Sequence, residues 1–224
     1  MKIAIDGPSG AGKSTISKIL AKNLGYIYID TGAMYRAIGL HALLCGFNTK
    51  SDTDKIINML KDIDIKISCG DLRQEVFLNN ENITDKIRTP EVSIAASDVA
   101  VIPQVRSKLV ELQRNLAEGN DVIMDGRDIA TFVLPDAEIK IFLTASAESR
   151  AKRRFKELNE KGIVTTFEEV LSDVIKRDKN DSEREINPLK IAEDATVIDT
   201  TDYNFDESVE LIEKFIVQEM KSKC

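Results

Sequence analysis

The sequence predicts an α/β fold in which a five-stranded parallel sheet is flanked by helices, with a small antiparallel insert and a helical, arginine-rich lid added to this core. Short apolar runs alternate with longer segments of helical periodicity, which is typical of parallel α/β sheets. Several of these runs lack polar alternation, as strands buried on both faces do. Two stretches, at residues 48–88 and 149–188, interrupt the rhythm. We therefore expect one core domain over residues 1–224 with two insertions.

The core elements follow in chain order. The predicted strands are Lys2–Asp6, Tyr26–Asp30, Asp121–Asp125, Glu138–Thr144 and Ala195–Asp199. Residues Ser14–Leu24 predict a helix, and Gly25 is suited to its C-terminal cap. From Asp206 to the end, apolar residues recur at helical spacing and predict a last helix.

Each insertion has its own pattern. Residues 48–88 predict a short amphipathic helix and an antiparallel sheet. The three short strands expected there are Asp64–Ser68, Val76–Leu78 and Asn82–Thr84, joined by Cys69-Gly70-Asp71 and Asn79-Asn80-Glu81-Asn82. Residues 149–188 predict charged helix, with a Thr166-x-x-Glu169 capping box and an end at Asn187-Pro188. We expect this segment to be a mobile lid, because its charges repel and little apolar surface ties it down.

Composition excludes several classes of function. The net charge of −7 and the absence of Trp argue against a nucleic-acid-binding surface. Three widely spaced cysteines form neither a disulfide framework nor a metal-ligand pattern, which favours a reducing cytoplasm. Asp6 interrupts the apolar start of the chain, and no apolar run approaches the ~20 residues that span a bilayer. We expect a cytoplasmic protein without a membrane anchor.

Residues Gly7 to Ser14 match the P-loop pattern G-x-x-x-x-G-K-[ST] in full. Glycines let such a loop turn its backbone N–H groups toward phosphate oxygens, and the dipole of the following helix favours anions. Lys13 is placed to reach the β- and γ-phosphates of ATP, and the Ser14 hydroxyl to bind Mg²⁺. The residues expected to contact the nucleotide are Gly7, Pro8, Ser9, Gly10, Ala11, Gly12, Lys13, Ser14 and Thr15.

An acidic group is also expected beside the P-loop. Asp125 ends a predicted core strand, and open α/β sheets bind ligands at the carboxyl ends of their strands. There it can hold the metal ion or orient water, as a Walker-B acid does. The alternative is a turn or N-cap aspartate. A GTPase would add an Asn-Lys-x-Asp motif, and the sequence contains none.

The lid segment is rich in arginine. The arginines that could meet phosphate groups are Arg150, Arg153, Arg154, Arg177 and Arg184. Arg177, Asp181 and Arg184 share one face if the helix continues that far. Such charges usually form a solvated face, but planar guanidinium groups also match the equatorial oxygens of a transferring phosphoryl group. We expect Arg150 and Arg154 to meet the ATP phosphates, and Arg177 and Arg184 to act in catalysis.

These motifs together resemble those of bacterial cytidylate kinases over nearly the whole chain. The stretches that carry the resemblance are Ile5–Thr15, Asp30-Thr31-Gly32-Ala33-Met34-Tyr35-Arg36, Ile87–Val92, Ala95-Ala96-Ser97, Val105-Arg106, Asp125–Ile129 and Arg177–Leu189. The resemblance implies a P-loop kinase fold and transfer of the γ-phosphoryl group of Mg-ATP to CMP, and to dCMP, in pyrimidine metabolism. We expect a monomer.

The resemblance further implies roles at matching positions. Ser97, Arg106 and Asp128 would recognise cytosine. Thr31 and Asp181 would meet the ribose. The acceptor phosphate would be bound by Arg36, Arg127, Arg177 and Arg184, and Arg127 would also take part in catalysis with Lys13 and Asp125.

Two positions depart from the common pattern of the family. Thr31 replaces a frequent Ser and Ala130 a frequent Gly, which leaves the tolerance for other sugars open. Two alternatives also stay open. UMP, AMP or shikimate could be the acceptor, or the chain could bind nucleotide without turnover.

Overall fold

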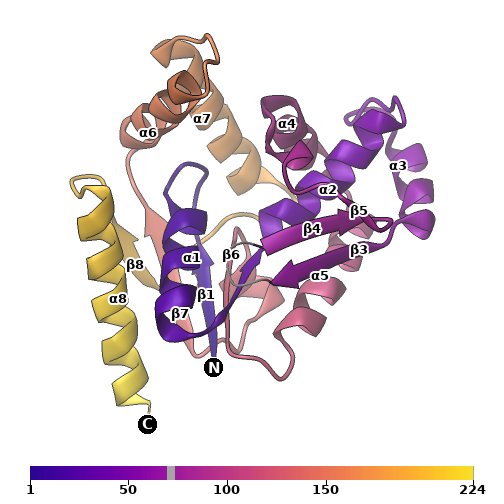
Figure 1. Ribbon diagram of the computed structural model, residues 1–224. Coiled ribbons are helices and arrows are strands. Elements are labelled where there is room, and N and C mark those ends of the chain that lie inside the picture. The colour runs from indigo at the N-terminus through magenta and orange to yellow at the C-terminus, as the bar shows by residue number, and fades with distance from the viewer. Residues whose placement is uncertain (70–73, 224) are drawn as a thin grey trace. The chain divides into compact units, whose positions relative to one another are not determined.

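The computed structural model describes residues 1–69 and 74–223. Gly70 and Asp71 of the turn predicted at Cys69-Gly70-Asp71 lie outside the described residues. Within the description the chain divides into two compact units (Figure 1), one formed by residues 1–26 and 121–224 and the other by residues 27–120.

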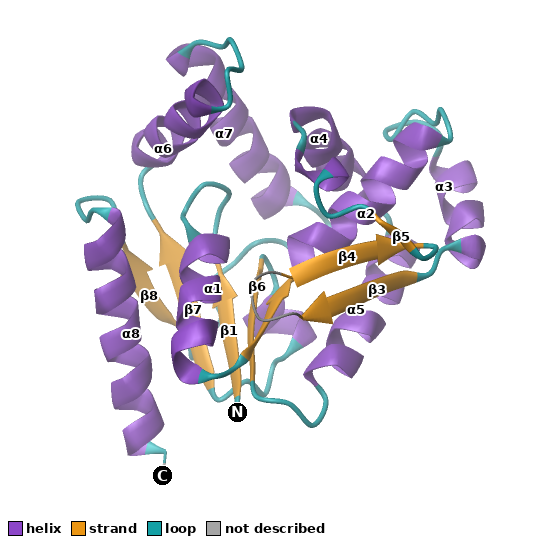
Figure 2. Ribbon diagram, in the orientation of Figure 1, coloured by secondary structure: helices purple, strands orange, loops and turns teal. Residues whose placement is uncertain are grey.

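The first unit is built on parallel strands (Figure 2). Its elements are β1 (Lys2–Asp6), α1 (Lys13–Leu24), β6 (Val122–Gly126), the π-helical turn η3 (Ile129–Val133), β7 (Ile139–Thr144), α6 (Ala147–Glu160), α7 (Phe167–Glu183), β8 (Thr196–Asp199) and α8 (Phe205–Ser222). β1 pairs in parallel with β6 and β7, and β7 pairs in parallel with β8. With β2, the strand order of the sheet is β2-β6-β1-β7-β8. The five-stranded core predicted from the sequence is confirmed, with each end within one residue of its expected place.

The central strands are buried because their sequences are apolar on both faces. Ile3, Ala4 and Ile5 of β1 are fully buried, and so are Ile123 of β6 and Ile141 of β7. α1 contacts β1 and β6, and α8 contacts α1 at its side (Figure 1). α1 ends at Gly25, which adopts a left-handed conformation, as predicted. The carboxyl ends of β1 and β6 lie next to each other, so the P-loop and Asp125 meet at one edge.

The second unit contains the predicted insert. Its elements are β2 (Ile27–Asp30), α2 (Thr31–Leu44), α3 (Thr53–Met59), the 3₁₀ turns η1 (Leu60–Asp62) and η2 (Lys86–Arg88), β3 (Ile65–Cys69), β4 (Gln74–Leu78), β5 (Glu81–Asn82), α4 (Pro90–Val99) and α5 (Pro103–Ala117). β3, β4 and β5 form an antiparallel sheet, as expected. Asn79 and Asn80 both have positive φ, the conformation that a two-residue hairpin turn requires. α2 packs along α4.

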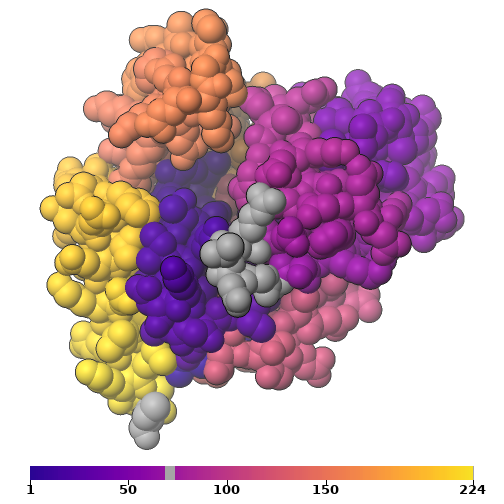
Figure 3. Space-filling view, viewed as in Figure 1, coloured from indigo at the N-terminus to yellow at the C-terminus, as the bar shows by residue number. Residues whose placement is uncertain are grey.

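The charged segment forms a helical hairpin of α6 and α7. The capping box at Thr166 and Glu169 is present in both directions. The predicted end at Asn187-Pro188 is wrong, because α7 ends at Glu183 and Arg184 already has extended backbone. The hairpin also has an apolar cluster of its own, formed by Ala151, Leu158, Val170 and Val174 with partly buried neighbours that include Phe155 and Phe167. In the space-filling view the atoms of this hairpin gather in one orange lobe at the top (Figure 3).

Candidate active site

The P-loop joins β1 to α1 in the first unit. Gly7 has a φ of 150°, and a Cβ at this position would stand 2.0 Å from the Leu143 carbonyl oxygen of β7. A larger residue is therefore excluded where the loop leaves the sheet. The loop ends at Gly12, which precedes the first turn of α1. The Lys13 side chain bends back over the loop, and its Nζ donates to the Pro8 carbonyl at 2.8 Å.

Lys13 is the buried cation of this site, with only 5% of its surface exposed. Burial and, to a smaller extent, the positive charge of the nearby Arg127 lower the pKa of Lys13 to about 7. Asp125, Asp6 and Asp181 oppose these effects, because their negative charges favour the ammonium form. Phosphate oxygens bound beside Lys13 would add further negative charge, which would favour the ammonium form and raise the pKa of Lys13.

Ser14 and Asp125 form the pair expected to hold a metal ion. Ser14 Oγ donates to Asp125 Oδ2 at 2.9 Å, and Asp125 is buried near the end of β6. A hydroxyl and a carboxylate are hard oxygen ligands of the kind that Mg²⁺ takes beside phosphates and waters. Among the described residues, no group of three or more His, Cys, Asp or Glu side chains is placed to hold a metal ion, so any Mg²⁺ here would need nucleotide oxygens and water to complete its shell.

Asp6 is a buried acid with no role predicted from the sequence motifs. Its two oxygens accept hydrogen bonds from the backbone N–H groups of Ile129 at 2.9 Å and Ala130 at 2.8 Å. Burial raises the pKa of Asp6 to about 6, although these two hydrogen bonds favour the charged form. Asp6 therefore fixes the backbone just after Asp128. Its position at the carboxyl end of a buried strand, the same signal that singled out Asp125, would have identified it.

Arginines and acids alternate in a network around Asp181. Arg127 Nε donates to Asp181 Oδ2 at 2.7 Å, and Arg184 Nη2 lies 3.4 Å from Asp128 Oδ1. Burial would raise the pKa of Asp181, but Arg127, Arg177 and Arg184 outweigh it and lower that pKa. The condition for Arg184 to share a helical face with Arg177 and Asp181 is not met, because α7 ends one residue earlier. The three arginines nevertheless act on one carboxylate, since the chain bends back after α7.

Arg150 and Arg154 differ sharply in their surroundings. Arg150 is buried, and its guanidinium makes four hydrogen bonds to protein oxygens of Ala145, Ser9 and Asp178. Arg154 is partly exposed and pairs with Glu157 at 3.1 Å on the same helix. Contact of either residue with ATP stays a prediction.

In the second unit, an ion pair stands at the start of α2. The Asp30 side chain caps this helix by accepting from the Ala33 N–H, and its other oxygen pairs with Arg36 Nη2 at 2.8 Å. Arg88 Nη2 lies 3.8 Å from the same oxygen. Arg36 Nε is buried and has no hydrogen-bond partner in the described part of the chain. Thr31, the expected ribose contact, is buried as the first residue of this helix.

Arg106 and Ser97 lie on α5 and α4 of this second unit. The Arg106 guanidinium lies over the Tyr35 ring at 5.7 Å from its centre, and Nη1 donates to the Ala100 carbonyl at 3.2 Å. Arg106 is buried and Ser97 is half-buried. A flat guanidinium held against an aromatic ring has a fixed orientation, which is what recognition of a planar base requires.

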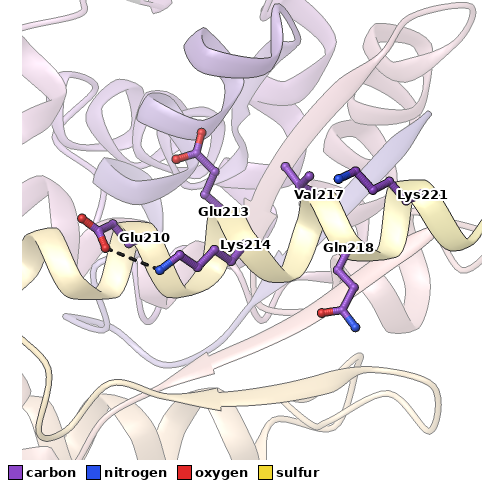
Figure 4. Close-up of a pocket in the computed structure, with 6 residues that line it drawn as sticks. All are labelled: Glu210, Glu213, Lys214, Val217, Gln218 and Lys221. Carbon is purple, nitrogen blue, oxygen red and sulfur yellow. Dashed lines mark ion pairs between the residues drawn. The ribbon is translucent and has the colours of Figure 1, made fainter.

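A separate pocket of about 450 Å³ runs along α8 (Figure 4). Its lining residues are Glu210, Glu213, Lys214, Val217, Gln218 and Lys221. These repeat at helical spacing, and the exposed Glu210 and Lys214 form an ion pair at 3.7 Å. None of the predicted site residues lines this pocket. We interpret it as a shallow, solvated helix face.

Comparison with known proteins decides the family. A family model described as cytidylate kinase matches residues 3–218. The chain belongs to the cytidylate kinase family. A family member from Caldicellulosiruptor bescii, named cytidylate kinase, is 53% identical over 100% of this chain and 98% of its own. Another, from Caldicellulosiruptor saccharolyticus, is 56% identical over 95% of this chain and 93% of its own.

The solved structures add support for the fold. An uncharacterised protein from Eubacterium ventriosum has a TM-score of 0.51 at 15% identity and covers 99% of this chain and 98% of its own. At that identity the likeness concerns the fold alone.

Among the described residues, every helix is too short or too polar to cross a membrane.

Proposed function

We propose that this protein transfers the γ-phosphoryl group of ATP to CMP and dCMP. The observation that carries the proposal is the full-length match to the cytidylate kinase family, joined to a P-loop whose Lys13 is buried among Asp125, Asp6 and Arg127. An oxygen of the acceptor phosphate would attack the γ-phosphorus, and the bond to the β–γ bridging oxygen would break to release ADP.

The chain's own groups would act mainly by position and charge. Lys13 would neutralise the β- and γ-phosphates, and Arg127, Arg177 and Arg184 would meet charge on the transferred group and on the acceptor phosphate. Ser14 and Asp125 would hold Mg²⁺, which when bound neutralises phosphate oxygens and orients them. Reaction between phosphates needs no strong general base.

The residues assigned to the acceptor stand as part of this proposal. We assign Ser97, Arg106 and Asp128 to cytosine, Thr31 and Asp181 to the ribose, and Arg36 to the acceptor phosphate. Cytosine offers an amino donor and two acceptors, which an acid, an arginine and a hydroxyl complement. A wrong base would leave buried polar groups unpaired, so it would be rejected. We also propose that the protein works in the cytoplasm as a monomer.

A panel of acceptors tests the proposal directly. The purified protein with Mg-ATP should release ADP in the presence of CMP or dCMP, and far more slowly with UMP, AMP or shikimate. The Lys13→Ala variant is the matched control. It should lose at least about a hundredfold in turnover, since a cation at the transferring phosphates is removed. Faster turnover with another acceptor would reassign the substrate. ADP release that ignores every acceptor would favour nucleotide binding without transfer.

A further inference from the structure

Asp178 of α7 forms a two-pronged ion pair with Arg150 of α6. Arg150 Nη1 donates to Oδ1 at 3.0 Å and Nη2 donates to Oδ2 at 2.6 Å. Only 4% of Arg150 is exposed. Paired hydrogen bonds between a guanidinium and a carboxylate fix direction as well as distance. The two helices of the hairpin are therefore joined here by a rigid polar contact, in addition to their apolar cluster.

The same guanidinium reaches the P-loop. Arg150 Nη1 also donates to the Ser9 carbonyl at 3.0 Å, and Nε donates to the Ala145 carbonyl at 2.8 Å. Gly10 has a φ of 78°, and a Cβ built there would stand 3.2 Å from the Arg150 Cβ. The arginine thus packs against the phosphate-binding loop and holds one of its carbonyls. That contact turns the Ser9 carbonyl toward Arg150.

Asp178 also sits between two residues of the arginine network. It follows Arg177 directly and precedes Asp181 by three positions on α7. A helix moves as a rigid element, so fixing Asp178 fixes the height of both neighbours relative to the P-loop. Without the carboxylate, Arg150 would be a buried cation with no ionic partner among the atoms it now contacts, and such a group reorganises its surroundings.

We propose that Asp178 is a positioning residue for the nucleotide site. Acting through Arg150, it holds the P-loop at Ser9 in the conformation that receives phosphates and keeps α7 in register with that loop. This role rests on the proposed function, since it concerns the same site. Binding of Mg-ADP needs no acceptor, however, so the two ideas can fail separately.

The test is calorimetric titration of Asp178→Asn with Mg-ADP. Loss of the ionic pair should weaken ADP binding roughly tenfold, as hydrogen bonds to charged groups do. Arg150→Lys keeps the charge but lacks the fork, so it should lose a similar factor. The double variant should lose no more than the worse single variant, because both changes break one contact. Glu157→Gln, which removes the exposed partner of Arg154 on the same hairpin, should stay within about twofold of wild type.

Thermal unfolding of each variant would confirm that it is folded. Wild-type affinity for ADP in a folded Asp178→Asn variant would overturn the proposal. Losses that add in the double variant would do so as well, because Asp178 would then act independently of Arg150. If Asp178→Asn does not fold, Arg150→Lys carries the test, and wild-type ADP affinity in that variant would be equally decisive. A wild-type protein that binds ADP but transfers nothing to CMP would refute the proposed function alone.

Discussion

Arg106 shows how one side chain can be oriented before any ligand arrives. Its guanidinium is buried, lies on the Tyr35 ring and donates to the Ala100 carbonyl. Removing it would leave a base without its partner. We expect Arg106→Ala to raise the Michaelis constant for CMP by roughly ten- to hundredfold, the cost of one buried polar contact. The gap between CMP and UMP should narrow, while the Michaelis constant for ATP should barely change.

Steady-state kinetics with each acceptor checks this expectation. Glu111→Ala is the control, because Glu111 is exposed on the same helix. If Arg106→Ala weakens ATP and leaves the preference for CMP intact, Arg106 serves the donor and its assignment to cytosine is reversed.

Single residues also show where sequence reasoning reached and where it stopped. The P-loop is local in sequence, so its spacing alone predicted that Lys13 and Ser14 lie where the loop meets the next helix, at the start of α1. The contact of Ser14 with Asp125 was also predictable, because parallel strands bring their carboxyl ends to one edge. The hydrogen bonds from the N–H groups of Ile129 and Ala130 to Asp6 were not predictable, since they depend on a π-helical turn that no local sequence pattern indicates.

The helical hairpin of α6 and α7 illustrates the same limit for whole elements. Its charge density concealed an apolar stripe, and α7 stopped before Asn187-Pro188 because Arg184 turns back to the arginine network. The core strands were easier, because a short apolar run bounded by polar residues has few alternatives. The packing of the apolar residues of α6 against those of α7 could not be predicted from the sequence, since each helix contributes only a few of them.

The apolar cluster of the hairpin leads to a prediction about its local stability. Leu158 is buried among Ala151, Val170 and Val174, and Phe155 meets Phe167 edge to face at 6.3 Å. Leu158→Ala would remove apolar contacts and leave a cavity, which typically costs about 2–5 kcal/mol. We expect hydrogen exchange to speed up across residues 147–183 and to remain unchanged in β1 and β6. Val164→Ala is the control, because Val164 is 98% exposed on the same hairpin.

Hydrogen exchange followed by mass spectrometry resolves these segments. Equal protection in Leu158→Ala and wild type would show that ionic contacts alone hold the hairpin. Faster exchange in β1 and β6 would show that the hairpin unfolds only together with the sheet.

The ionisable groups of the molecule act on its stability in opposite directions as pH changes. Asp181 has a lowered pKa in the folded chain, so its contribution is present above the unfolded value of 3.8 and is lost as pH falls through the folded value. Asp52, Glu169, Asp194 and Asp199 also have lowered pKa values, because hydrogen bonds favour their charged forms. Acid unfolding therefore belongs to this group and begins below the range in which Asp6 titrates.

Asp6 reverses that sign. Its pKa is raised from 3.8 to about 6 because burial penalises the carboxylate, so between these values the folded chain binds more protons than the unfolded chain. The free energy of unfolding then falls as pH rises, and the Asp6 contribution present at pH 4.5 is lost by pH 7, a change of about 1–3 kcal/mol.

The Asp6→Asn variant tests this, because it removes the titration and keeps the shape of the side chain. Between pH 4.5 and pH 7, the free energy of unfolding of the wild type should fall by that amount relative to the variant. Urea unfolding of both proteins at pH 4.5, 5.5 and 7 measures it, and the titrations of groups that do not interact with Asp6 cancel in the difference. Asp202→Asn, an exposed change, should show no such trend. A difference that is constant with pH would mean that the hydrogen bonds from Ile129 and Ala130 keep Asp6 ionised throughout this range.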